Sequence, residues 1–531
     1  MENETAFFPM EIFGDNWAKL HDAVESLRPQ MRDGARILPV KSDFLANGGR
    51  AYWDTGNHFE ISTPECGSVY DLVAWGKAGE RILEDIAATL NIQGSPASRI
   101  RAKFARFGGC TFFKNNTNMN SERWSPDTRD YRSRTHYVSW GNHYNLPLNI
   151  REVSYDEALP ILGPFLFSSS WMTGSGLVWV TNGGRLLYSL SQRAPFVDRL
   201  SGTSSTAPMR PMVLLCDEPL ADRREYWRLQ IIGLDSSMCE WQMYVPNVIL
   251  GILLRMIEGR VLRKEDYKKD SGRFSRELAY MQTRTMWWGS EHQTFRFQNE
   301  EYDAVRLHRK LYLEPILAYK ASLFREAARS GSPVLWSNEE EDGLQKYIFL
   351  IEAFERARSP LECAEILAPY VGWAAKLHYW ILPDMERNGY SFESAPILPL
   401  EIITKSGTTS KTDAWGRMKF FDNFFHDVRR DKGLYYKLVQ KGLVALIVSE
   451  SEILHAKNHA PSGTRAEARD KRIAALRGHT NADLMEVGWN YLRYYPKSGR
   501  GWSPDVVTEY DEDPFDPNPG AFQRVRFPDG V

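Results

Sequence analysis

The sequence predicts an α+β protein in which a strand-rich region precedes a helix-rich one. Two observations lead to this prediction. Between residues 50 and 234, short runs of β-branched and aromatic residues lie between turn signals, a pattern typical of strands. Between residues 247 and 388, long segments carry apolar residues at helical spacing. Strands and helices that are grouped along the chain in this way indicate the α+β class.

At the N-terminal end, the sequence predicts a polar helix, a hairpin and an amphipathic helix. The polar helix covers residues 15–27, and the hairpin covers residues 50–63 with its turn at Thr55-Gly56-Asn57. Apolar residues at helical spacing predict a packed helix over residues 69–90. Further strands are predicted at residues 110–117, 177–190, 211–216 and 226–234.

The C-terminal half is predicted to be helical and then to form a smaller domain. Helices are predicted over residues 247–259, 305–331, 343–359 and 361–388, and over 433–443. A Gly/Ser/Thr/Lys segment at residues 405–411 indicates a flexible link. Asp and Pro dominate the last residues, a composition that cannot build a core. We therefore predict a main domain over 1–400, a small C-terminal domain over 412–502, and a mobile, acidic, Pro-rich tail over 503–531.

Composition and charge exclude several classes of protein. The chain has 66 Lys and Arg residues against 68 Asp and Glu, so no excess of positive charge predicts binding to nucleic acid or anionic lipid. Its five cysteines form no C-x-x-C pair, which argues against a disulfide framework or a zinc ribbon. The first residues are acidic where a signal peptide is basic, and the longest apolar run, residues 248–254, is too short to span a bilayer. We expect a cytoplasmic protein with no nucleic-acid or membrane partner.

Several familiar catalytic motifs do not occur in the sequence. There is no G-x-x-x-x-G-K-[ST] phosphate loop, and Thr173-Gly-Ser-Gly176 lacks the third glycine of a dinucleotide fingerprint. The motifs H-E-x-x-H and G-x-S-x-G do not occur either, which argues against a metalloprotease or a serine hydrolase.

The predicted hairpin gathers the strongest set of polar side chains. Side chains alternate between the faces of a strand, so Arg50, Tyr52 and Asp54 share one face. The return strand can bring His58 and Glu60 beside them. This set suits phosphates bridged by a hard cation, because Mg²⁺ takes oxygen ligands and Arg binds phosphate bidentately. From spacing alone, a salt-bridged, solvent-facing hairpin explains the same pattern.

Other polar clusters are weaker signals. Residues 114–117 and 139–145 could position phosphate or carboxylate oxygens, although Asn-Asn-Thr is also ordinary turn chemistry. Residues 190–193, residues 217–222 and Arg228 form either an ion-pair network or the lining of an anion site. The candidate substrate or phosphate contacts are Lys114, Asn116, His143, Asn145, Arg193 and Arg228.

Taken in order, these segments resemble one family, the ligases and depupylases that attach and remove the prokaryotic ubiquitin-like protein Pup. Each motif is modest by itself, but the ordered set is specific and spans most of the chain. The motifs are Phe44-Leu-Ala-Asn-Gly-Gly-Arg-Ala-Tyr-Trp-Asp54, His58-Phe-Glu60, Thr63-Pro-Glu-Cys66, Lys77-Ala-Gly-Glu80, Phe113-Lys-Asn-Asn-Thr117, Leu190-Ser-Gln-Arg-Ala194, Asp217-Glu-Pro219, Arg228-Leu229, Asp235-Ser236 and Phe425-His-Asp-Val-Arg-Arg-Asp-Lys-Gly-Leu-Tyr-Tyr-Lys437.

The resemblance implies a glutamine-synthetase-like carboxylate–amine ligase fold, with a curved antiparallel sheet flanked by helices and a small C-terminal domain that completes the nucleotide site. It implies ATP and Mg²⁺ as cofactors, Pup or a Pup-like small protein as the carboxylate donor, and target proteins as lysine donors. By position, it implies Asp54 as the catalytic carboxylate, Arg50, Thr63 and Trp489 as ATP contacts, and Glu4, Tyr52 and Glu60 as metal ligands.

Physical chemistry agrees with these implied roles. A carboxylate is a poor electrophile, so amide formation needs an activated intermediate, which transfer of the ATP γ-phosphoryl group supplies as an acyl phosphate. Mg²⁺ and Arg50 would offset charge on the phosphoryl oxygens during this transfer. A lysine with an unperturbed pKa of about 10.4 is mostly protonated at pH 7. A base must therefore take a proton before the amine attacks, and Asp54 is the candidate.

One feature favours the ligase over the depupylase. Depupylases carry a long extra loop between the first-strand glutamate and the catalytic aspartate, whereas the stretch from Glu4 to Asp54 is compact. Residues 74–80 and 173–176 look slightly more like the depupylase versions. We expect an isopeptide-forming ligase that phosphorylates a glutamate side-chain carboxylate and joins it to a target lysine. The alternative is a depupylase or deamidase that hydrolyses the isopeptide or a side-chain amide.

Several positions depart from the family pattern. Ala6 stands where the first strand of the family has a glutamate, and Leu220 and Gln230 each replace a histidine. Tyr144 replaces the glutamate of a His-Glu-Asn motif, and residues 119–138 enlarge a loop. Because Leu220 and Gln230 occupy positions that handle substrate more than ATP, we expect a divergent Pup-like protein or peptide as donor. A non-catalytic descendant is a third class, but the retained catalytic and metal positions argue against it.

Overall fold

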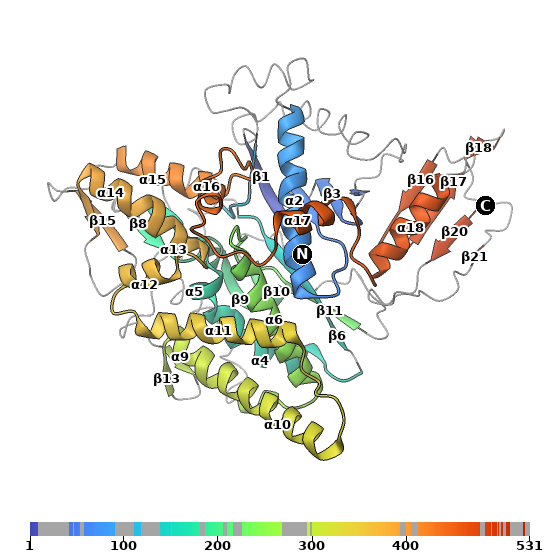
Figure 1. Ribbon diagram of the computed structural model, residues 1–531, viewed down its shortest axis with the longest axis horizontal. Coiled ribbons are helices and arrows are strands. Elements are labelled where there is room, and N and C mark those ends of the chain that lie inside the picture. Colours follow the sequence, from blue (N-terminus) through green and yellow to red (C-terminus); the bar gives the residue numbers. More distant parts are fainter. Residues whose placement is uncertain are drawn as a thin grey trace. The chain divides into compact units, whose positions relative to one another are not determined.

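The computed structural model divides into two compact units, whose elements are labelled in Figure 1. Unit 1 comprises Met1–Phe113, Glu218–Glu225 and Val448–Val531, and unit 2 comprises Lys114–Asp217 and Tyr226–Ile447. The structure describes residues 1–8, 42–45, 47–53, 58–90, 111–117, 139–149, 151–180, 186–204, 210–215, 226–267, 295–297, 300–392, 400–404, 413–477, 484–489, 491–495, 497–498, 501–502, 506–509 and 524–525.

Some predicted features lie outside the described residues. They are the polar helix over 15–27, the hairpin turn at residues 55–57 and the link over 405–411. The division into domains over 1–400 and 412–502 stays a prediction. No described helix combines the length and the apolar character needed to cross a membrane.

Antiparallel strands form the sheet of unit 1, in the order β2-β3-β4-β1 with β5 paired to the far end of β1. The predicted hairpin is confirmed, because β3 and β4 pair with Arg50 opposite Ser62 and Tyr52 opposite Glu60. The strands are β1 (Glu2–Phe8), β2 (Ser42–Phe44), β3 (Arg50–Trp53), β4 (Phe59–Ser62) and β5 (Thr111–Phe113).

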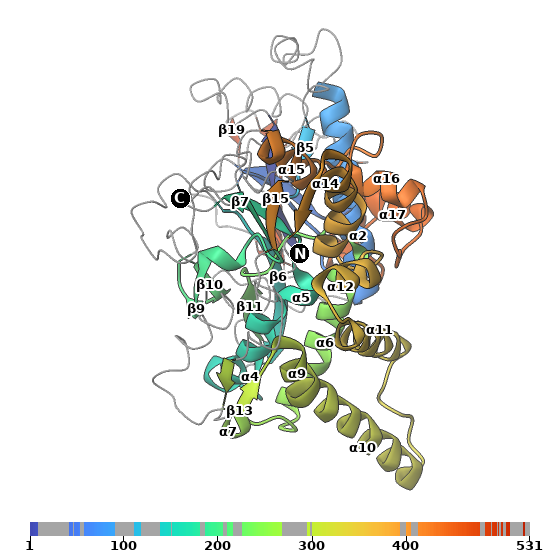
Figure 2. The same cartoon turned by 90° about the vertical axis from the view of Figure 1, so that its left-hand side faces the viewer.

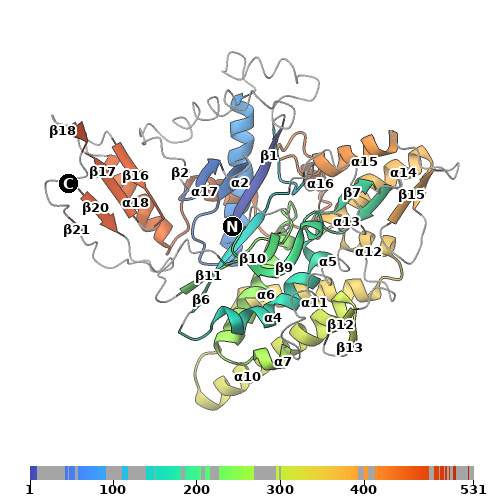
Figure 3. The same cartoon turned by 180° about the vertical axis from the view of Figure 1, so that it is seen from behind.

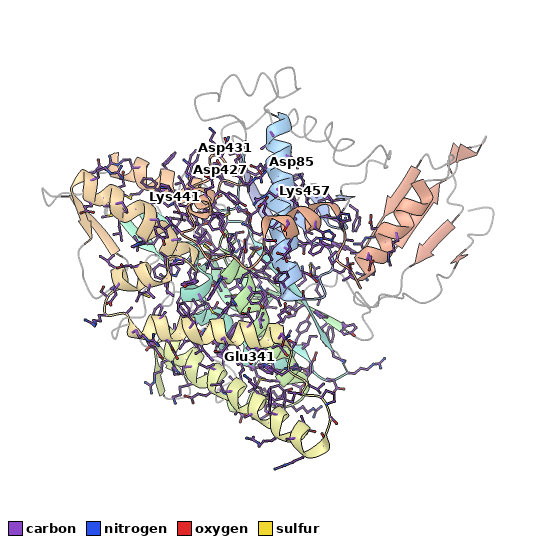
Figure 4. All side chains as sticks on the ribbon, viewed as in Figure 1. Asp85, Glu341, Asp427, Asp431, Lys441 and Lys457 are labelled. Atoms are coloured by element: carbon purple, nitrogen blue, oxygen red, sulfur yellow. The ribbon has the colours of Figure 1, made fainter. Side chains whose placement is uncertain are left out.

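Helix α2 (Val69–Leu90) confirms the amphipathic helix predicted over residues 69–90. It packs against α17 (Glu450–Asn458), with the Trp75 indole donating to the His459 carbonyl at 2.9 Å. Figure 4 labels Asp85 and Lys457, which form an ion pair between the two helices. These contacts join the N-terminal and C-terminal segments of unit 1.

The C-terminal segment of unit 1 contains α18 (Arg465–Arg477) and two small sheets, which Figure 3 shows from behind. One sheet has the strand order β16-β17-β20-β21 and the other pairs β18 with β19. Residues 506–509 form β20 within the segment predicted as a mobile tail over 503–531, and the mobility of that segment stays a prediction. The β-branched run Val-Val-Thr favours pairing with β17 despite the acidic residues around it. The strands are β16 (Leu484–Val487), β17 (Tyr491–Tyr495), β18 (Lys497–Ser498), β19 (Gly501–Trp502), β20 (Val506–Glu509) and β21 (Arg524–Val525).

Unit 2 contains two larger groups of strands. One has the order β6-β11-β10-β9, in which β9 and β10 are parallel and the other pairs antiparallel. The other has the order β14-β15-β8-β7 and is antiparallel where its pairs are described. The strands of unit 2 are β6 (Asn142–Asn149), β7 (Leu177–Val180), β8 (Leu186–Ser189), β9 (Val197–Gly202), β10 (Arg210–Leu214), β11 (Tyr226–Ile231), β12 (Phe295–Phe297), β13 (Glu300–Tyr302), β14 (Tyr390–Phe392) and β15 (Leu400–Thr404).

The helices of unit 2 cluster around the apolar helix α6 (Glu240–Glu258). Both α6 and α11 (Asn338–Arg356) begin earlier than predicted. Helix α11 begins after Ser337, which forms a capping box with Glu340, a signal that hydrophobic spacing alone does not reveal. The other helical elements are α4 (Tyr155–Ser168), α5 (Ser170–Thr173), η6 (Ala194–Phe196), α7 (Lys264–Tyr267), α9 (Ala304–His308), η7 (Arg309–Leu313), α10 (Glu314–Ser330), α12 (Pro360–Leu367), α13 (Gly372–Lys376), η8 (Leu377–Ile381), α14 (Leu382–Asn388), α15 (Asp413–Phe424) and α16 (Leu434–Gln440).

Two predicted helices are interrupted by π-helical segments. The helix predicted over residues 305–331 runs through α9, η7 and α10, and Figure 2 shows α10 as the long continuation of α9. In the same way, η8 separates α13 from α14. Each π segment ends two residues before a proline, Pro315 or Pro383. Proline donates no backbone hydrogen bond and its ring crowds the preceding turn, and the wider π turn accommodates both effects.

Helices α6 and α11 approach closely at Gly343, and this contact predicts opposite effects for two glycine substitutions. A Cβ atom at Gly343 would lie 2.4 Å from Val248 Cγ1, so Gly343→Ala should destabilise the protein by about 1 to 3 kcal/mol. Gly251, in the exposed face of α6, has no heavy atom within 4 Å of such a Cβ. Gly251→Ala should stabilise by about 0.5 to 1 kcal/mol through helix propensity. Urea unfolding of both variants tests this, and equal shifts would contradict the proposed helix contact.

Candidate functional site

The register of three strands in unit 1 aligns the predicted metal positions. Tyr52 of β3 lies opposite Glu60 of β4, and Glu60 lies opposite Glu4 of β1. Directly opposed residues of antiparallel strands share a face, so the Tyr52 phenol and the Glu60 carboxylate point the same way. The Ser62 hydroxyl donates to the Tyr52 hydroxyl at 3.3 Å, and Glu60 is buried. The backbone register therefore places these three residues in one row across the sheet.

Oxygen donors in this row match the ligand type that Mg²⁺ prefers. The Glu4 side chain and the whole of Asp54 lie outside the described residues, so their roles as metal ligand and catalytic carboxylate stay predictions. Within the part of the chain that the structure describes, no cluster of three or more His, Cys, Asp or Glu side chains could hold a metal ion.

The structure brings two predicted ATP contacts together from distant parts of unit 1. The Arg50 guanidinium lies 5.4 Å from the centre of the Trp489 indole, 5.1 Å from that of the Phe44 ring and 5.6 Å from that of the Tyr52 ring. Phe44 meets Trp489 edge-on with ring centres 5.1 Å apart. A guanidinium over aromatic faces is a favourable cation–π arrangement. Thr63, the third predicted contact, is buried just after β4, and its hydroxyl accepts a hydrogen bond from the Met1 amino group at 2.9 Å.

The Asn47-Gly48-Gly49 turn between β2 and β3 sets the position of Arg50. Gly48 has a φ of +80°, a conformation that side chains other than glycine rarely adopt. A Cβ at Gly49 would lie 2.6 Å from the Ser62 carbonyl oxygen, so only glycine fits beside β4. The Asn47 side chain accepts from the Gly49 amide and donates to the Ala456 carbonyl. The local sequence therefore fixes the start of β3 for steric reasons.

Sequence analysis missed a buried ion cluster beside this site. The Glu65 carboxylate accepts hydrogen bonds from Arg465 Nε at 2.9 Å and from Arg469 Nη1 and Nη2 at 3.1 and 2.9 Å. Burial alone would raise the pKa of Glu65, but the charges of Arg469 and Arg465 lower it to about 2. Two arginines spaced four residues apart on α18 were a signal for a shared partner, but nothing local in the sequence identified Glu65 as that partner.

In unit 2, three candidate substrate contacts lie on one face of β6 and β11. Asn145 is opposite Gln230, and Arg228 is two residues further along on the same face. Arg228 Nε donates to Asn145 Oδ1 at 2.8 Å. His143 precedes Asn145 by two residues and therefore shares its face. This face therefore gathers an imidazole, two amides and a guanidinium, of which the His143 and Gln230 side chains are buried.

Arg193 is buried beside His143. It donates to the Ser139 hydroxyl at 2.8 Å and to the Ile232 carbonyl at 3.0 Å. A Cβ at Gly141 would lie 2.2 Å from His143 Nε2 and 3.4 Å from Arg193 Nη2, so the glycine lets the two side chains approach. The Asp235 carboxylate accepts from the backbone amides of residues 192 and 193 and thereby orients the loop that carries Arg193.

Lys114 and Asn116 are buried in hydrogen bonds within unit 2. Lys114 Nζ donates to the Ser237 carbonyl at 2.9 Å. Asn116 donates to the Trp140 carbonyl at 3.0 Å and accepts from the Ser236 amide at 2.6 Å. These contacts connect three loops, which is a structural role, and a contact of either residue with substrate stays a prediction. The predicted motif at residues 217–219 lies outside the described residues.

The C-terminal motif at residues 425–437 contributes to a second buried ion cluster, in unit 2. Lys376 Nζ lies 2.6 Å from Asp422 Oδ1, and Lys419 Nζ lies 2.7 Å from Asp422 Oδ2. Burial would raise the pKa of Asp422, but the two lysines lower it to about 2. Burial also lowers the pKa of His426 well below its usual value, so its ring is neutral at 3.2 Å from Lys376 Nζ.

Comparison with known proteins identifies relatives over most of the chain. The model of the Pup-ligase protein family matches residues 14–315 and 398–493. A Pup–protein ligase of Acidimicrobium ferrooxidans is 30% identical over 464 residues, covering 86% of this chain and 84% of that protein. A Pup–protein ligase of Nocardioides sp. is 28% identical over 490 residues, covering 91% and 89%.

Two solved structures share the fold. The crystal structure of the ligase PafA in complex with the prokaryotic ubiquitin-like protein Pup has a TM-score of 0.68 at 20% identity and covers 97% of this chain and 89% of that chain. The structure of PafA in complex with ADP has a TM-score of 0.65 at 21% identity and covers 94% and 90%. The α+β class expected from the sequence agrees with this similarity.

The Glu65 cluster predicts a pH-dependent contribution to stability. Because the pKa of Glu65 falls from 4.5 to about 2 on folding, the carboxylate stabilises the protein fully above about pH 4.5 and loses this effect as the pH falls towards 2. Glu65→Gln should therefore cost about 3 to 5 kcal/mol at pH 7 and much less near pH 2. Urea unfolding against pH measures the difference. Glu467→Gln is the control and should change stability little, because Glu467 lies on α18 with Arg465 and Arg469 but pairs with Lys471 at the surface. A cost of Glu65→Gln that stays constant with pH would contradict the ion pairing.

Proposed function

The chain belongs to the Pup-ligase family, and from this premise we propose that it is an ATP-dependent ligase. Its reaction joins a glutamate side-chain carboxylate of Pup, or of a Pup-like protein, to a lysine amine of a target protein through an isopeptide bond. Relatives that match most of the chain carry the name Pup–protein ligase, which supports this direction of the reaction over hydrolysis.

One arrangement in unit 1 supports the proposal most directly. Arg50 of β3 lies against Trp489. Two residues further along β3, on the same face, Tyr52 lies opposite Glu60 of β4. A nucleoside triphosphate that binds with a divalent cation requires a guanidinium, an aromatic face and oxygen donors. We assign Arg50, Thr63 and Trp489 to ATP and Glu4, Tyr52 and Glu60 to the metal.

Activation of the donor carboxylate is the first chemical step. A carboxylate oxygen of the donor glutamate attacks the γ-phosphorus of ATP, the bond to the β-phosphate oxygen breaks, and ADP leaves. Negative charge spreads over the transferring phosphoryl oxygens, and the Arg50 guanidinium offsets part of it. Bound Mg²⁺ would supply further neutralisation of phosphate charge.

Amide formation is the second step. The ε-amino group of the target lysine attacks the acyl carbon, phosphate leaves, and the amine loses a proton. Asp54, assigned from its place in the family motif, takes this proton, because a protonated lysine has no lone pair for attack. Water must be kept from the acyl phosphate, since hydrolysis would consume ATP without forming a conjugate.

We assign the polar face of unit 2 to recognition of the donor. This face is formed by Arg228, Asn145, His143 and Gln230, and it carries one guanidinium beside other polar side chains. Such a surface suits a carboxylate or phosphate oxygen. The proposal also includes a glutamine-synthetase-like architecture and a cytoplasmic location.

Intact-mass analysis tests the ligase and its donor. The protein is incubated with Mg·ATP, Pup ending in glutamate and a pool of lysine-bearing proteins. We expect a conjugate lighter by one water than its two parts, and we expect Asp54→Asn to abolish it because the amine then keeps its proton. Asp85→Asn makes the same chemical change at the exposed ion pair with Lys457 and should leave conjugation unchanged.

The pattern of failure separates the alternatives. Loss of isopeptide or side-chain amide without ATP consumption would identify a hydrolase instead of a ligase. Binding of Mg·ATP without any conjugate would mean that the donor is not Pup, and full activity of Asp54→Asn would contradict the assigned base.

Substitution of Arg228 tests the role of the polar face. Arg228→Ala removes a charge-assisted contact and should raise the KM for the carboxylate donor by about tenfold, with little change in the KM for ATP. Arg199→Ala is the control, because Arg199 lies exposed on β9 and pairs with Asp198. Steady-state conjugation kinetics measure both constants, and an equal rise in both KM values would argue against a donor contact.

A further inference from the structure

Arg469 of α18 lies at the meeting point of three segments of unit 1. Its Nη2 donates to the Gly48 carbonyl at 2.9 Å and to Glu65 Oε2 at 2.9 Å. Its Nη1 donates to the Trp489 carbonyl at 3.0 Å and to Glu65 Oε1 at 3.1 Å. One guanidinium therefore joins the turn before β3, the residues after β4 and the C-terminal segment that carries Trp489.

The same guanidinium also packs against the aromatic pair beside Arg50. Its centre lies 4.5 Å from that of the Phe44 ring and 5.4 Å from that of the Trp489 ring. Arg50 contacts these two rings as well, at 5.1 and 5.4 Å. Arg469 is fully buried, so these contacts are made out of water, where cation–π and charged hydrogen bonds are strongest.

We propose that Arg469 is a positioning residue for ATP, which holds Trp489 and the Gly48 turn in the places from which Trp489 and Arg50 contact the nucleotide. This rests on the assignment of Arg50 and Trp489 to ATP in the proposed function. Arg469 acts through these two residues. Glu65 completes the arrangement, because its carboxylate occupies both terminal nitrogens and fixes the plane of the guanidinium.

Lysine cannot replace arginine in this role. Arg469 donates to two carbonyls and a carboxylate while its guanidinium centre lies near two aromatic rings, which a planar group with several donors in fixed directions can do. A lysine ammonium is a compact charge without the fixed, forked set of donors that reaches Gly48, Glu65 and Trp489 together. Arg469→Lys therefore keeps the charge and loses the geometry.

The test compares Arg469→Lys with Arg465→Lys. Both arginines are buried and bind Glu65, but the Arg469 hydrogen bonds continue to Gly48 and Trp489. Isothermal titration with Mg·ATP and steady-state conjugation are measured below the melting temperature of each variant. Arg469→Lys should raise the Kd and the KM for ATP by about tenfold or more, with kcat within about twofold of wild type. Arg465→Lys should lower the melting temperature to a similar degree and leave the affinity for ATP unchanged.

A double-mutant cycle tests whether Arg469 acts through Trp489. Trp489→Phe keeps Glu65 and Arg469 intact, and it should raise the KM for ATP by itself. If Arg469 acts through Trp489, the double variant Arg469→Lys with Trp489→Phe should bind ATP no more weakly than the worse single variant, because both changes remove the same interaction. If Arg469→Lys does not fold, Glu65→Asp replaces it in the cycle, because it keeps the charge between Arg465 and Arg469 and moves the carboxylate that orients the Arg469 guanidinium.

Different results overturn the inference and the proposed function. Unchanged ATP affinity of folded Arg469→Lys, equal loss of affinity in Arg465→Lys, or additive effects in the cycle would overturn the positioning role. Absence of Mg·ATP binding by the wild-type protein would instead overturn the proposed function on which it rests.

Discussion

The antiparallel register of β1, β4 and β3 is the constraint on which the candidate site in unit 1 depends. It sets Tyr52 opposite Glu60 and gives Glu4 the matching position on the next strand. Side-chain direction alternates along a strand, so a slip of one residue would turn the members of this row to opposite faces. The turn before β3 resists such a slip. A shift that put a residue with a side chain at the position of Gly49 would bring its Cβ atom into collision with the Ser62 carbonyl oxygen. Steric limits on the backbone therefore determine which face of the sheet these side chains occupy.

Each unit also contains a buried carboxylate shared by two cations: Glu65 between Arg465 and Arg469, and Asp422 between Lys376 and Lys419. Removing charges from water costs several kcal/mol per ion, and the attraction between them offsets this cost only when every partner is in place. Each cluster is complete only when segments from distant parts of the chain meet. The clusters therefore link correct folding to the geometry of the residues around them, and in unit 1 those residues include Trp489.

The departures from the family pattern separate by strand face once the register of β6 and β11 is known. Tyr144 replaces a family glutamate, but it is buried on the apolar face of β6 opposite Ile231, and burial raises the pKa of its hydroxyl to about 12. Its change is therefore one of packing. Gln230 replaces a histidine on the polar face, beside Asn145 and two residues from Arg228. This position belongs to the face that the proposed function assigns to the donor, so the proposal of a divergent Pup-like donor depends on it.

The sequence by itself determined the elements whose signals are local. Apolar spacing defined α2 to its last residue, strand alternation placed Tyr52 with Arg50, and the ordered motifs identified the family and the candidate roles of Arg50, Glu60 and Trp489. The capping box of Ser337 and Glu340 that starts α11 is also local, but apolar spacing reveals neither it nor the π segments before Pro315 and Pro383. Only the tertiary structure decided that Trp489 lies against Arg50 and that Glu65 binds Arg469. The physical reason is that burial and ion pairing depend on which distant segments meet, and spacing along the chain carries no record of those partners.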